Sequence, residues 1–409
     1  MNPLTAQATT PPTANAISGT VKPGFEAMRD AFVENFERRG ELGAACCVYY
    51  RGEKVVDLWG GIRNRATGEP WEAGTMVIVF STTKGLAGLA LALAHSRGLF
   101  DYDERVSTYW PEFAQQGKEA ITVRQLLSHQ AGLAALDEPP DRAVIADLDR
   151  LAVILARQKP AWEPGTCQGY HALTLGFYES ELLRRVDPWH RSLGQYFQDE
   201  IASPLGAEFY IRLPEEIPNS RLATLKPANM ARAFFTVPAA LTLAAMNPWS
   251  LIRRALWASL WPLDEARIYA RNFEIPSGGG VGTARGISQA YGQFATGGDR
   301  LGLREETLKE LMAPAVPPLH GFYDHALKVP ARYSLGFLKP HDDVPFGHPG
   351  AFGTPGAGGS FGFADPEAQI GYGYVTNQMG TYLIDPRDQA LRDAMYRSIG
   401  DPDPYHGRA

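Results

Sequence analysis

The sequence predicts an α+β fold in which a mainly antiparallel sheet is flanked by helices, with a helical insertion in the middle of the chain. Strand-like stretches with glycine turns occur near both ends, at 43–61 and 333–377, and helical periodicity dominates between them. Strands from both ends can share one sheet if the middle of the chain forms a separate helical unit. We therefore expect a disordered N-terminal arm at 1–21, a discontinuous α/β domain of 22–80 and 281–400, and a mainly helical domain at 81–280, with an active site at their seam.

Local patterns predict the individual elements. Apolar residues recur at helical spacing in 23–40, and the two strands of 43–61 flank the turn Arg51–Gly52. Further helices are predicted at 81–97, 122–132, 141–158, 172–186, within 228–260, after the glycine loop at 277–286, and at 385–399. The apolar and aromatic segment 228–260 is expected to cover a substrate cleft or, alternatively, to form an oligomer or membrane-facing patch.

Composition argues against several functional classes. The 409-residue chain is 44% hydrophobic and 21% charged with a formal net charge of −6, so it lacks the basic footprint of a nucleic-acid-binding protein. The cysteines Cys46, Cys47 and Cys167 suit neither a disulfide framework nor a zinc site. The N-terminus lacks the pattern of a signal peptide, and the apolar run after Ser81 is too short to span a membrane. We expect a cytoplasmic protein with reduced thiols, and homo-oligomerisation is left open.

A candidate catalytic pair, Ser81 and Lys84, lies at the start of the predicted helix 81–97. Side chains three residues apart share a helix face, with Cβ atoms about 5–6 Å apart, so the hydroxyl and the amine can meet. Burial against the apolar helix would lower the pKa of the lysine, and a serine hydroxyl needs such a proton acceptor to become a nucleophile. The structural alternative is a helix-capping serine and a lysine that extends to solvent. None of the other serines has a lysine three residues later.

Four elements in this order resemble the serine β-lactamase and penicillin-binding-protein superfamily, whose first motif is S-x-x-K. Ser81 and Lys84 match that motif, and 122–133 resembles its T-x-x-x-L-L-x-H-x-x-G-L element. Residues 162–176 resemble the P-G-x-x-x-x-Y-x-N element, with Tyr170 at the tyrosine, and 352–377 resemble the strand of the third motif and the following D-P tail. The resemblance covers residues 22–400, looks most like the family VIII carboxylesterases, and implies a β-lactamase/transpeptidase-like fold.

The same resemblance implies a mechanism of acyl transfer. Tyr170 would be the second catalytic group, and a Lys84 cation is expected to lower the pKa of its phenol so that Tyr170 takes the Ser81 proton. The oxyanion would be held by the backbone N–H groups of Ser81 and Ala357. No metal or organic cofactor is implied.

Departures from the β-lactamase pattern favour neutral esters. Ala172 stands where β-lactamases usually have an asparagine, and an apolar methyl group cannot hold a drug's amide side chain. The K-T-G motif aligns with Thr354–Gly356, which we prefer, or with His348–Gly350, and neither supplies the lysine. By the resemblance, Thr354, Gly356 and His348 are candidate substrate-binding residues. We therefore expect a carboxylesterase that acts on small-molecule esters with short acyl chains or aryl groups. The alternatives are an amide or β-lactam hydrolase, an acyltransferase on the same scaffold, and a catalytically silent structural scaffold.

Three other features have structural interpretations. Gly358–Gly362 is a formal G-x-S-x-G around Ser360, but the following segment has a strand pattern rather than the helix that a nucleophile elbow requires. We expect Ser360 to support a strand that lines the site. The glycine loop at 277–286 lacks the spacing of a dinucleotide-binding motif. His129 is expected to be a buried histidine whose ring is hydrogen-bonded.

Overall fold

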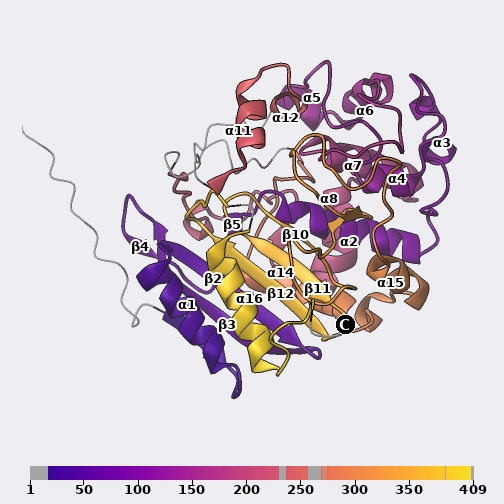
Figure 1. The fold of residues 1–409 in the computed structure, drawn as a ribbon. Coiled ribbons are helices and arrows are strands. Elements are labelled where there is room, and N and C mark those ends of the chain that lie inside the picture. The colour runs from indigo at the N-terminus through magenta and orange to yellow at the C-terminus, as the bar shows by residue number, and fades with distance from the viewer. Residues whose placement is uncertain are drawn as a thin grey trace, which may run out of the picture.

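A large antiparallel sheet with helices on both faces adjoins a mainly helical region in this protein (Figure 1). The computed structural model describes residues 17–229, 236–256, 269, 271, 273–382 and 384–406. The architecture is the α+β fold that the sequence predicts, with a mainly antiparallel sheet flanked by helices.

The large sheet has nine strands in the described part of the chain, in the order β1-β3-β2-β12-β11-β10-β9-β8, with β4 paired to β3. The strands are β1 (Ile17–Val21), β2 (Gly43–Tyr50), β3 (Glu53–Asn64), β4 (Glu69–Pro70), β8 (Tyr333–Ser334), β9 (Phe337–Leu338), β10 (Phe352–Pro355), β11 (Phe361–Asp365) and β12 (Ile370–Thr376). The pairing of β2 with β12 joins the two ends of the chain in one sheet and sets Cys47 opposite Gly373.

Helices cover both faces of this sheet. The helices α1 (Glu26–Arg38) and α16 (Pro386–Ser398) lie on one face, and α14 (Ala284–Ala295) lies on the other (Figure 1). Successive residues of a strand point to opposite faces. Cys46 therefore packs in the core beneath α1 and α16, whereas Cys47 packs in the core that α14 shares with the helical region. Both thiols are free.

The helical region surrounds α2 (Thr82–Ser96), which is buried along almost its whole length. The other helices of the described chain are α3 (Val106–Tyr109), α4 (Val123–Leu127), α5 (Arg142–Ala146), α6 (Leu148–Arg157), α7 (Thr174–Val186), α8 (Leu193–Phe197), α9 (Ser203–Leu205), α11 (Ala239–Met246), α12 (Leu251–Ala255) and α15 (Glu305–Met312), together with the short turns η2 (Pro111–Phe113), η3 (Gln198–Ala202), η4 (Asn219–Arg221) and η5 (Asp299–Leu301). A small sheet of β5 (Val77–Ile78), β7 (Val281–Gly282) and β6 (Phe209–Tyr210) lies beside α2.

Most predicted helices match observed ones, but the helix predicted at 122–132 ends at Leu127, before His129, whose φ is +60°. Two further corrections concern a helix break and the N-terminal arm. The predicted helix 141–158 is two helices, because the Asp147 side chain accepts a hydrogen bond from the Arg150 backbone N–H and starts α6 anew. The predicted arm 1–21 is wrong at 17–21, where β1 pairs with β3 and rests Ile17 and Val21 on the core. Residues 1–16 lie outside the described residues. The domain boundaries at 80/81 and 280/281 stay a prediction.

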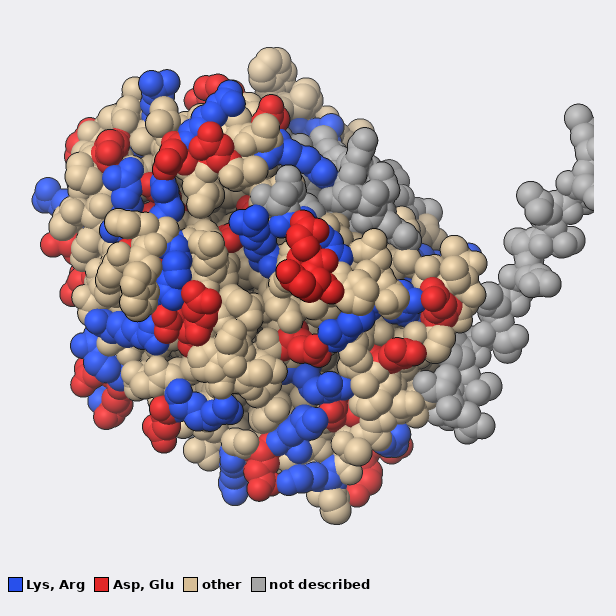
Figure 2. Space-filling view, turned by 180° about the vertical axis from the view of Figure 1, so that it is seen from behind, with Lys and Arg blue, Asp and Glu red and all other residues tan. Residues whose placement is uncertain are grey.

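The surface carries an exposed apolar group on α11 and just after it. Leu243, Met246 and Trp249 are 68%, 74% and 86% exposed. Within the described residues, no helix combines the length and the apolar character that crossing a bilayer requires. On the face shown in Figure 2, basic and acidic side chains are interspersed rather than gathered into a field of one sign.

Candidate active site

Ser81 occupies the N-cap position of α2, but its side chain makes no capping hydrogen bond. Its hydroxyl accepts a hydrogen bond from the Tyr170 phenol at 2.6 Å and lies 3.2 Å from the Lys84 Nζ. The preceding residue, Phe80, has a φ of +47°, a left-handed conformation that is strained for a bulky side chain and is typical of functional sites. The structure thus brings together the hydroxyl, the amine and the phenol that the sequence singles out.

Lys84 is a buried amine rather than a lysine that reaches solvent, since only 1% of its surface is exposed. Its Nζ lies 2.7 Å from the Ala172 carbonyl oxygen and 2.8 Å from that of Ser277. Burial lowers the Lys84 pKa to about 7, although the Glu179 carboxylate opposes this shift. A substantial fraction of the amine is therefore neutral near neutral pH. Sequence reasoning missed the carbonyl of Ser277, whose position at the start of the glycine loop was the available signal.

Tyr170 is held in a loop before α7, where its backbone N–H donates to the Asp324 carboxylate at 3.0 Å. Its ring stacks on Tyr333 with centroids 5.9 Å apart, and the Lys84 Nζ lies 4.7 Å from the ring centroid. Burial raises the pKa of the phenol well above its usual value, and the hydrogen bond to Ser81 lowers it only in part. The expectation that a Lys84 cation lowers this pKa is wrong, because burial dominates, the Asp324 carboxylate raises the pKa further, and only the hydrogen bond with Ser81 opposes them. The phenol is neutral and acts as a donor.

Two buried histidines support the loop of Tyr170. The His129 Nδ1 accepts a hydrogen bond from the His171 backbone N–H at 3.0 Å, and the His171 Nε2 accepts one from the Leu133 N–H at 2.9 Å. Burial lowers the pKa of His129 and that of His171, the latter to about 4, so both rings are neutral. His129 has the hydrogen-bonded, buried environment that the sequence predicts. It also lines the cavity that contains Ser81, Lys84 and Tyr170, which is the catalytic cavity.

Ser81 and Ala357, which both line the catalytic cavity, each have a free backbone N–H group. Neither N–H has a hydrogen-bond acceptor among the described residues. Ala357 lies in the turn after β10, directly after the predicted third motif Thr354–Gly356, which also lines the cavity. Free backbone N–H groups in such a position can stabilise an oxyanion.

Ser360 fastens this turn to the segment before the nucleophile. Its hydroxyl donates to the Val79 carbonyl oxygen at 2.9 Å and lies 3.1 Å from the Thr82 hydroxyl. The backbone N–H of Gly356 donates to the Ser360 carbonyl oxygen at 2.7 Å. The strand β11 follows Ser360, so the strand–turn–helix of a nucleophile elbow is absent here. The predicted supporting role fits these contacts.

His348 is not a substrate-binding residue, which corrects the prediction for it. The imidazole is 1% exposed, with Nδ1 2.8 Å from the Asp365 carboxylate and Nε2 3.0 Å from that of Asp401. It lies before β10 begins at Phe352 and joins β11 to the chain after α16. The side chain is thus occupied in a buried ion-pair cluster, and it is not among the residues that line the catalytic cavity.

The catalytic cavity has a volume of about 240 Å³ and a mainly apolar wall. Much of this wall comes from the segment 327–344, which includes the β8–β9 hairpin and which sequence reasoning did not single out as part of the site. Its apolar side chains include Leu327, Val329, Tyr333, Phe337, Leu338 and Val344. Lys84 is the only lysine or arginine among the described lining residues. The expectation that 228–260 covers the cleft is wrong for α11 and α12, which contribute no described residue to it; 230–235 and 257–260 lie outside the described residues.

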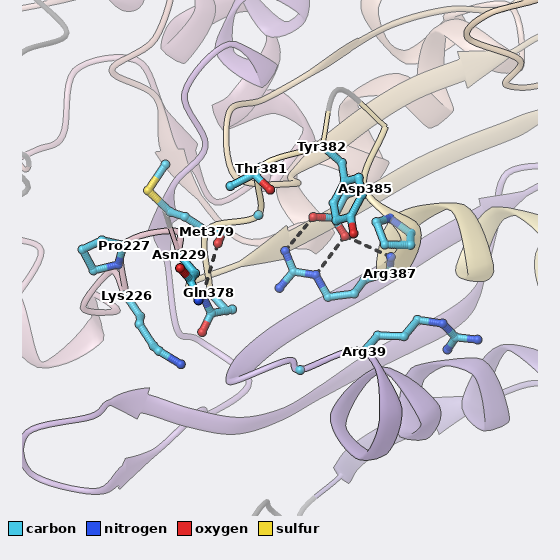
Figure 3. Close-up of a pocket in the computed structure, with 13 residues that line it drawn as sticks. Arg39, Lys226, Pro227, Asn229, Gln378, Met379, Thr381, Tyr382, Asp385 and Arg387 are labelled. Carbon is cyan, nitrogen blue, oxygen red and sulfur yellow. Dashed lines mark hydrogen bonds and ion pairs between the residues drawn. The ribbon is translucent and has the colours of Figure 1, made fainter. Parts of the chain in front are cut away.

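A second hollow, of about 400 Å³, adjoins the catalytic cavity at Tyr382, which lines both (Figure 3). At its edge the Arg387 guanidinium forms an ion pair with Asp385 at 2.7 Å and donates to the Gly358 carbonyl oxygen at 3.0 Å. Gly358 follows Ala357 in the turn. The Arg387 guanidinium, held by Asp385, therefore supports the turn that carries the free N–H group of Ala357.

The described residues contain no group of three or more His, Cys, Asp or Glu side chains that could hold a metal ion. The polar groups at the catalytic cavity include the hydroxyl, amine and phenol around Ser81 and the N–H groups of Ser81 and Ala357. Such a constellation can perform nucleophilic acyl transfer.

Known proteins match this chain in sequence and in fold over nearly its whole length. The beta-lactamase family profile matches residues 28–395. The chain is 31% identical over 385 residues to "Esterase/beta-lactamase LipL" of Mycobacterium tuberculosis (strain ATCC 25618 / H37Rv), covering 91% of this chain and 86% of that protein. Among solved structures it resembles a family VIII carboxylesterase, with 37% identity, a TM-score of 0.81, and 93% and 99% of the two chains covered. It also resembles EstA from Arthrobacter nitroguajacolicus Rue61a, with 33% identity, a TM-score of 0.80, and 94% and 99% covered. The chain therefore belongs to the beta-lactamase family, in the part of it that contains family VIII carboxylesterases.

Proposed function

We propose that this serine hydrolase of the beta-lactamase family is a carboxylesterase that cleaves short-chain or aryl esters through an acyl-enzyme on Ser81. The observation that carries the proposal is the hydrogen-bonded group of Ser81, Lys84 and Tyr170 at the wall of an apolar cavity. The lack of a second cationic side chain among the described lining residues favours neutral substrates. The names of LipL and of the family VIII carboxylesterase support the same reaction class.

Lys84 is the proposed general base. A neutral amine has two N–H donors and one lone pair, and two of the three neighbours of Nζ, the carbonyl oxygens of Ala172 and Ser277, can only accept. Both N–H groups are then used on carbonyls, and the lone pair remains for the Ser81 hydroxyl. Tyr170, protonated because of its burial, donates to the Ser81 oxygen. The hydroxyl proton therefore moves to Lys84 as Ser81 attacks the ester carbonyl.

The oxyanion of the tetrahedral intermediate would accept hydrogen bonds from the N–H groups of Ser81 and Ala357. Each donor of this kind contributes about 3–4 kcal/mol in other serine enzymes. When the C–O bond of the ester breaks, the alkoxide takes a proton from the Tyr170 phenol, and the proton held by Lys84 restores the phenol. Water then attacks the acyl-enzyme by the same route, which releases the acid and returns the proton to Ser81.

An amide or β-lactam hydrolase is the second candidate, and the printed name of LipL includes both activities. Two features weigh against it. Ala172 presents a methyl group in place of an amide, and Thr354 stands where the third-motif lysine would attract a carboxylate. An acyltransferase on the same scaffold differs only in the acceptor that resolves the acyl-enzyme.

The experiment compares turnover of p-nitrophenyl butyrate, nitrocefin and a D-alanyl amide by the wild type and by Ser81→Ala. We expect hydrolysis of the ester to exceed that of the other two, and Ser81→Ala to abolish it. Intact-mass measurement after brief exposure to an activated ester should show one acyl adduct, mapped by peptide analysis to Ser81. Ester turnover that survives in Ser81→Ala would contradict the proposal, and preference for nitrocefin or the amide would favour the second candidate. Failure of a fluorophosphonate to label the wild type would favour a silent scaffold.

A further inference from the structure

A buried carboxyl group near the catalytic lysine takes no part in the hydrogen bonds described above. Glu179, on α7, is 0% exposed, and neither of its carboxyl oxygens has a hydrogen-bond partner among the described residues. The large majority of buried polar side-chain atoms in proteins do have a partner. A buried carboxyl group without one is unfavourable unless a nearby charge compensates for the loss of water.

The packing of the helices directs this carboxyl group toward the lysine-bearing face of α2. The Oε1 of Glu179 lies 3.3 Å from the point where a Cβ on Gly336 would be, and the Cα of Gly88 lies 3.4 Å from the same point. Gly88 is one helical turn after Lys84 and thus on the same face of α2. Gly336, in the turn between β8 and β9, also lines the catalytic cavity. Two glycines therefore leave room for the Glu179 carboxyl group just behind the cavity wall.

The charges of Glu179 and Lys84 act on each other. The carboxylate raises the Lys84 pKa that burial lowers, and the amine lowers the Glu179 pKa that burial raises. The other titratable groups that face Lys84 are Tyr170, His129 and His171. Burial keeps the phenol protonated and both imidazoles neutral near neutral pH. Among the described residues, Glu179 is thus the group whose change of charge reaches the amine.

We propose that Glu179 and Lys84 form a coupled pair in which the carboxyl group sets the pH range over which the amine can accept the Ser81 proton. Glu179 is thus a positioning residue: its charge changes the basicity of Lys84, and its side chain does not touch the substrate. An ionised Glu179 makes Lys84 a stronger base but keeps it cationic to higher pH. In the reaction itself the Ser81 O–H bond breaks, an N–H bond forms on Nζ, and Glu179 keeps its proton count. The inference rests on the proposed nucleophile.

The test measures the rate at which a fluorophosphonate labels Ser81 as a function of pH, because this rate reports nucleophile activation without an ester substrate. We expect Glu179→Gln to move the midpoint of the acid limb to lower pH by about one unit, which is a tenfold change in the ionisation constant. We also expect the labelling rate above the limb to fall several-fold, because the amine is then a weaker base.

The matched control is Glu181→Gln, which removes another buried carboxylate from α7. Glu181 is 4% exposed and pairs with Arg184 and Arg185 rather than with the lysine. This variant should be less stable to heat, while its midpoint stays at the wild-type pH. A merely structural role for Glu179 would make the two variants alike.

Equal midpoints in the wild type and in Glu179→Gln would overturn the proposal. Circular dichroism checks that each variant is folded, and Glu179→Met, which keeps the length of the side chain and removes the buried charge, replaces the glutamine variant if that one does not fold. An unlabelled wild type would refute the proposed nucleophile and with it both proposals, whereas a labelled wild type with an unmoved midpoint in the variants would refute the coupled pair alone.

Discussion

Replacing Gly356 by alanine should damage the proposed oxyanion site through backbone displacement alone. A Cβ at this position would lie 2.1 Å from the Val79 carbonyl oxygen and 2.3 Å from the Ser360 hydroxyl oxygen, both of which adjoin the site. Since contacts shorter than 3.0 Å are essentially never formed by a Cβ, the turn or the strand end at Val79 must move by roughly 1 Å. Either movement separates the N–H of Ala357 from that of Ser81.

The size of the effect follows from that displacement. Misplacement by 1 Å, or the loss of one oxyanion donor, costs roughly 10²-fold to 10³-fold in kcat, or about 3–4 kcal/mol of transition-state stabilisation. We expect kcat for p-nitrophenyl butyrate to fall by about two orders of magnitude in Gly356→Ala, with a much smaller change in KM. Thermal unfolding should show that the variant remains folded at the assay temperature.

The matched control is Gly278→Ala, in the loop that begins at Ser277. A Cβ there has its nearest neighbour, the backbone carbon of Phe80, at 4.0 Å, so no movement is needed. This variant should retain activity within a few-fold of the wild type. A folded Gly356→Ala variant with kcat close to that of the wild type would refute the reasoning, because the N–H of Ala357 would then not depend on the position of the turn.

Three further predictions concern single groups. Tyr170→Phe removes the 2.6 Å hydrogen bond to Ser81 and the proposed proton donor to the alcohol, so kcat should fall by roughly 10²–10⁴ while a fluorophosphonate still labels the serine slowly. Because the base is the neutral form of Lys84, whose pKa burial lowers to about 7, kcat/KM should rise with pH through about 7 and then level off; a profile that falls over this range would exclude the amine as base. His348→Ala removes the imidazole partner of the buried Asp365 carboxylate, which keeps the hydrogen bond from the Tyr396 hydroxyl, so the loss should be about 3 kcal/mol of unfolding free energy while kcat/KM stays within a few-fold. A large loss of kcat/KM in the folded variant would show instead that His348 contributes to substrate binding.

Local sequence identified the first half of the site because its parts are close in the chain. Ser81 and Lys84 are three residues apart, and any regular helix brings such side chains together. The apolar run after them predicts that the amine is buried, and the structure agrees. Tyr170 was found only through the order of motifs in the resemblance, since no local pattern joins it to Ser81.

Other parts of the site come from segments that carry at most a weak sign of function in the sequence. The Ser277 carbonyl oxygen is a backbone atom, so no side-chain motif marks it. Glu179 is one acidic residue in a helix that contains other charged residues, and only the packing of α7 against α2 distinguishes it from Glu181. His348 has the residue type expected of a substrate-binding group, but the structure shows it occupied by two carboxylates.

The sequence by itself determined the α+β class, the helical element that carries Ser81 and Lys84, and the pairing of strands from both ends of the chain. The class and the helix depend on periodicity and on residues that are near in the chain, the pairing follows from the order of the predicted elements, and the tertiary structure did not alter them. Only the tertiary structure decided the protonation states, because the pKa values of Lys84 and Tyr170 depend on burial by segments far apart in sequence. Burial favours the neutral form of both groups, and for that physical reason the proposed base moved from the phenol to the amine.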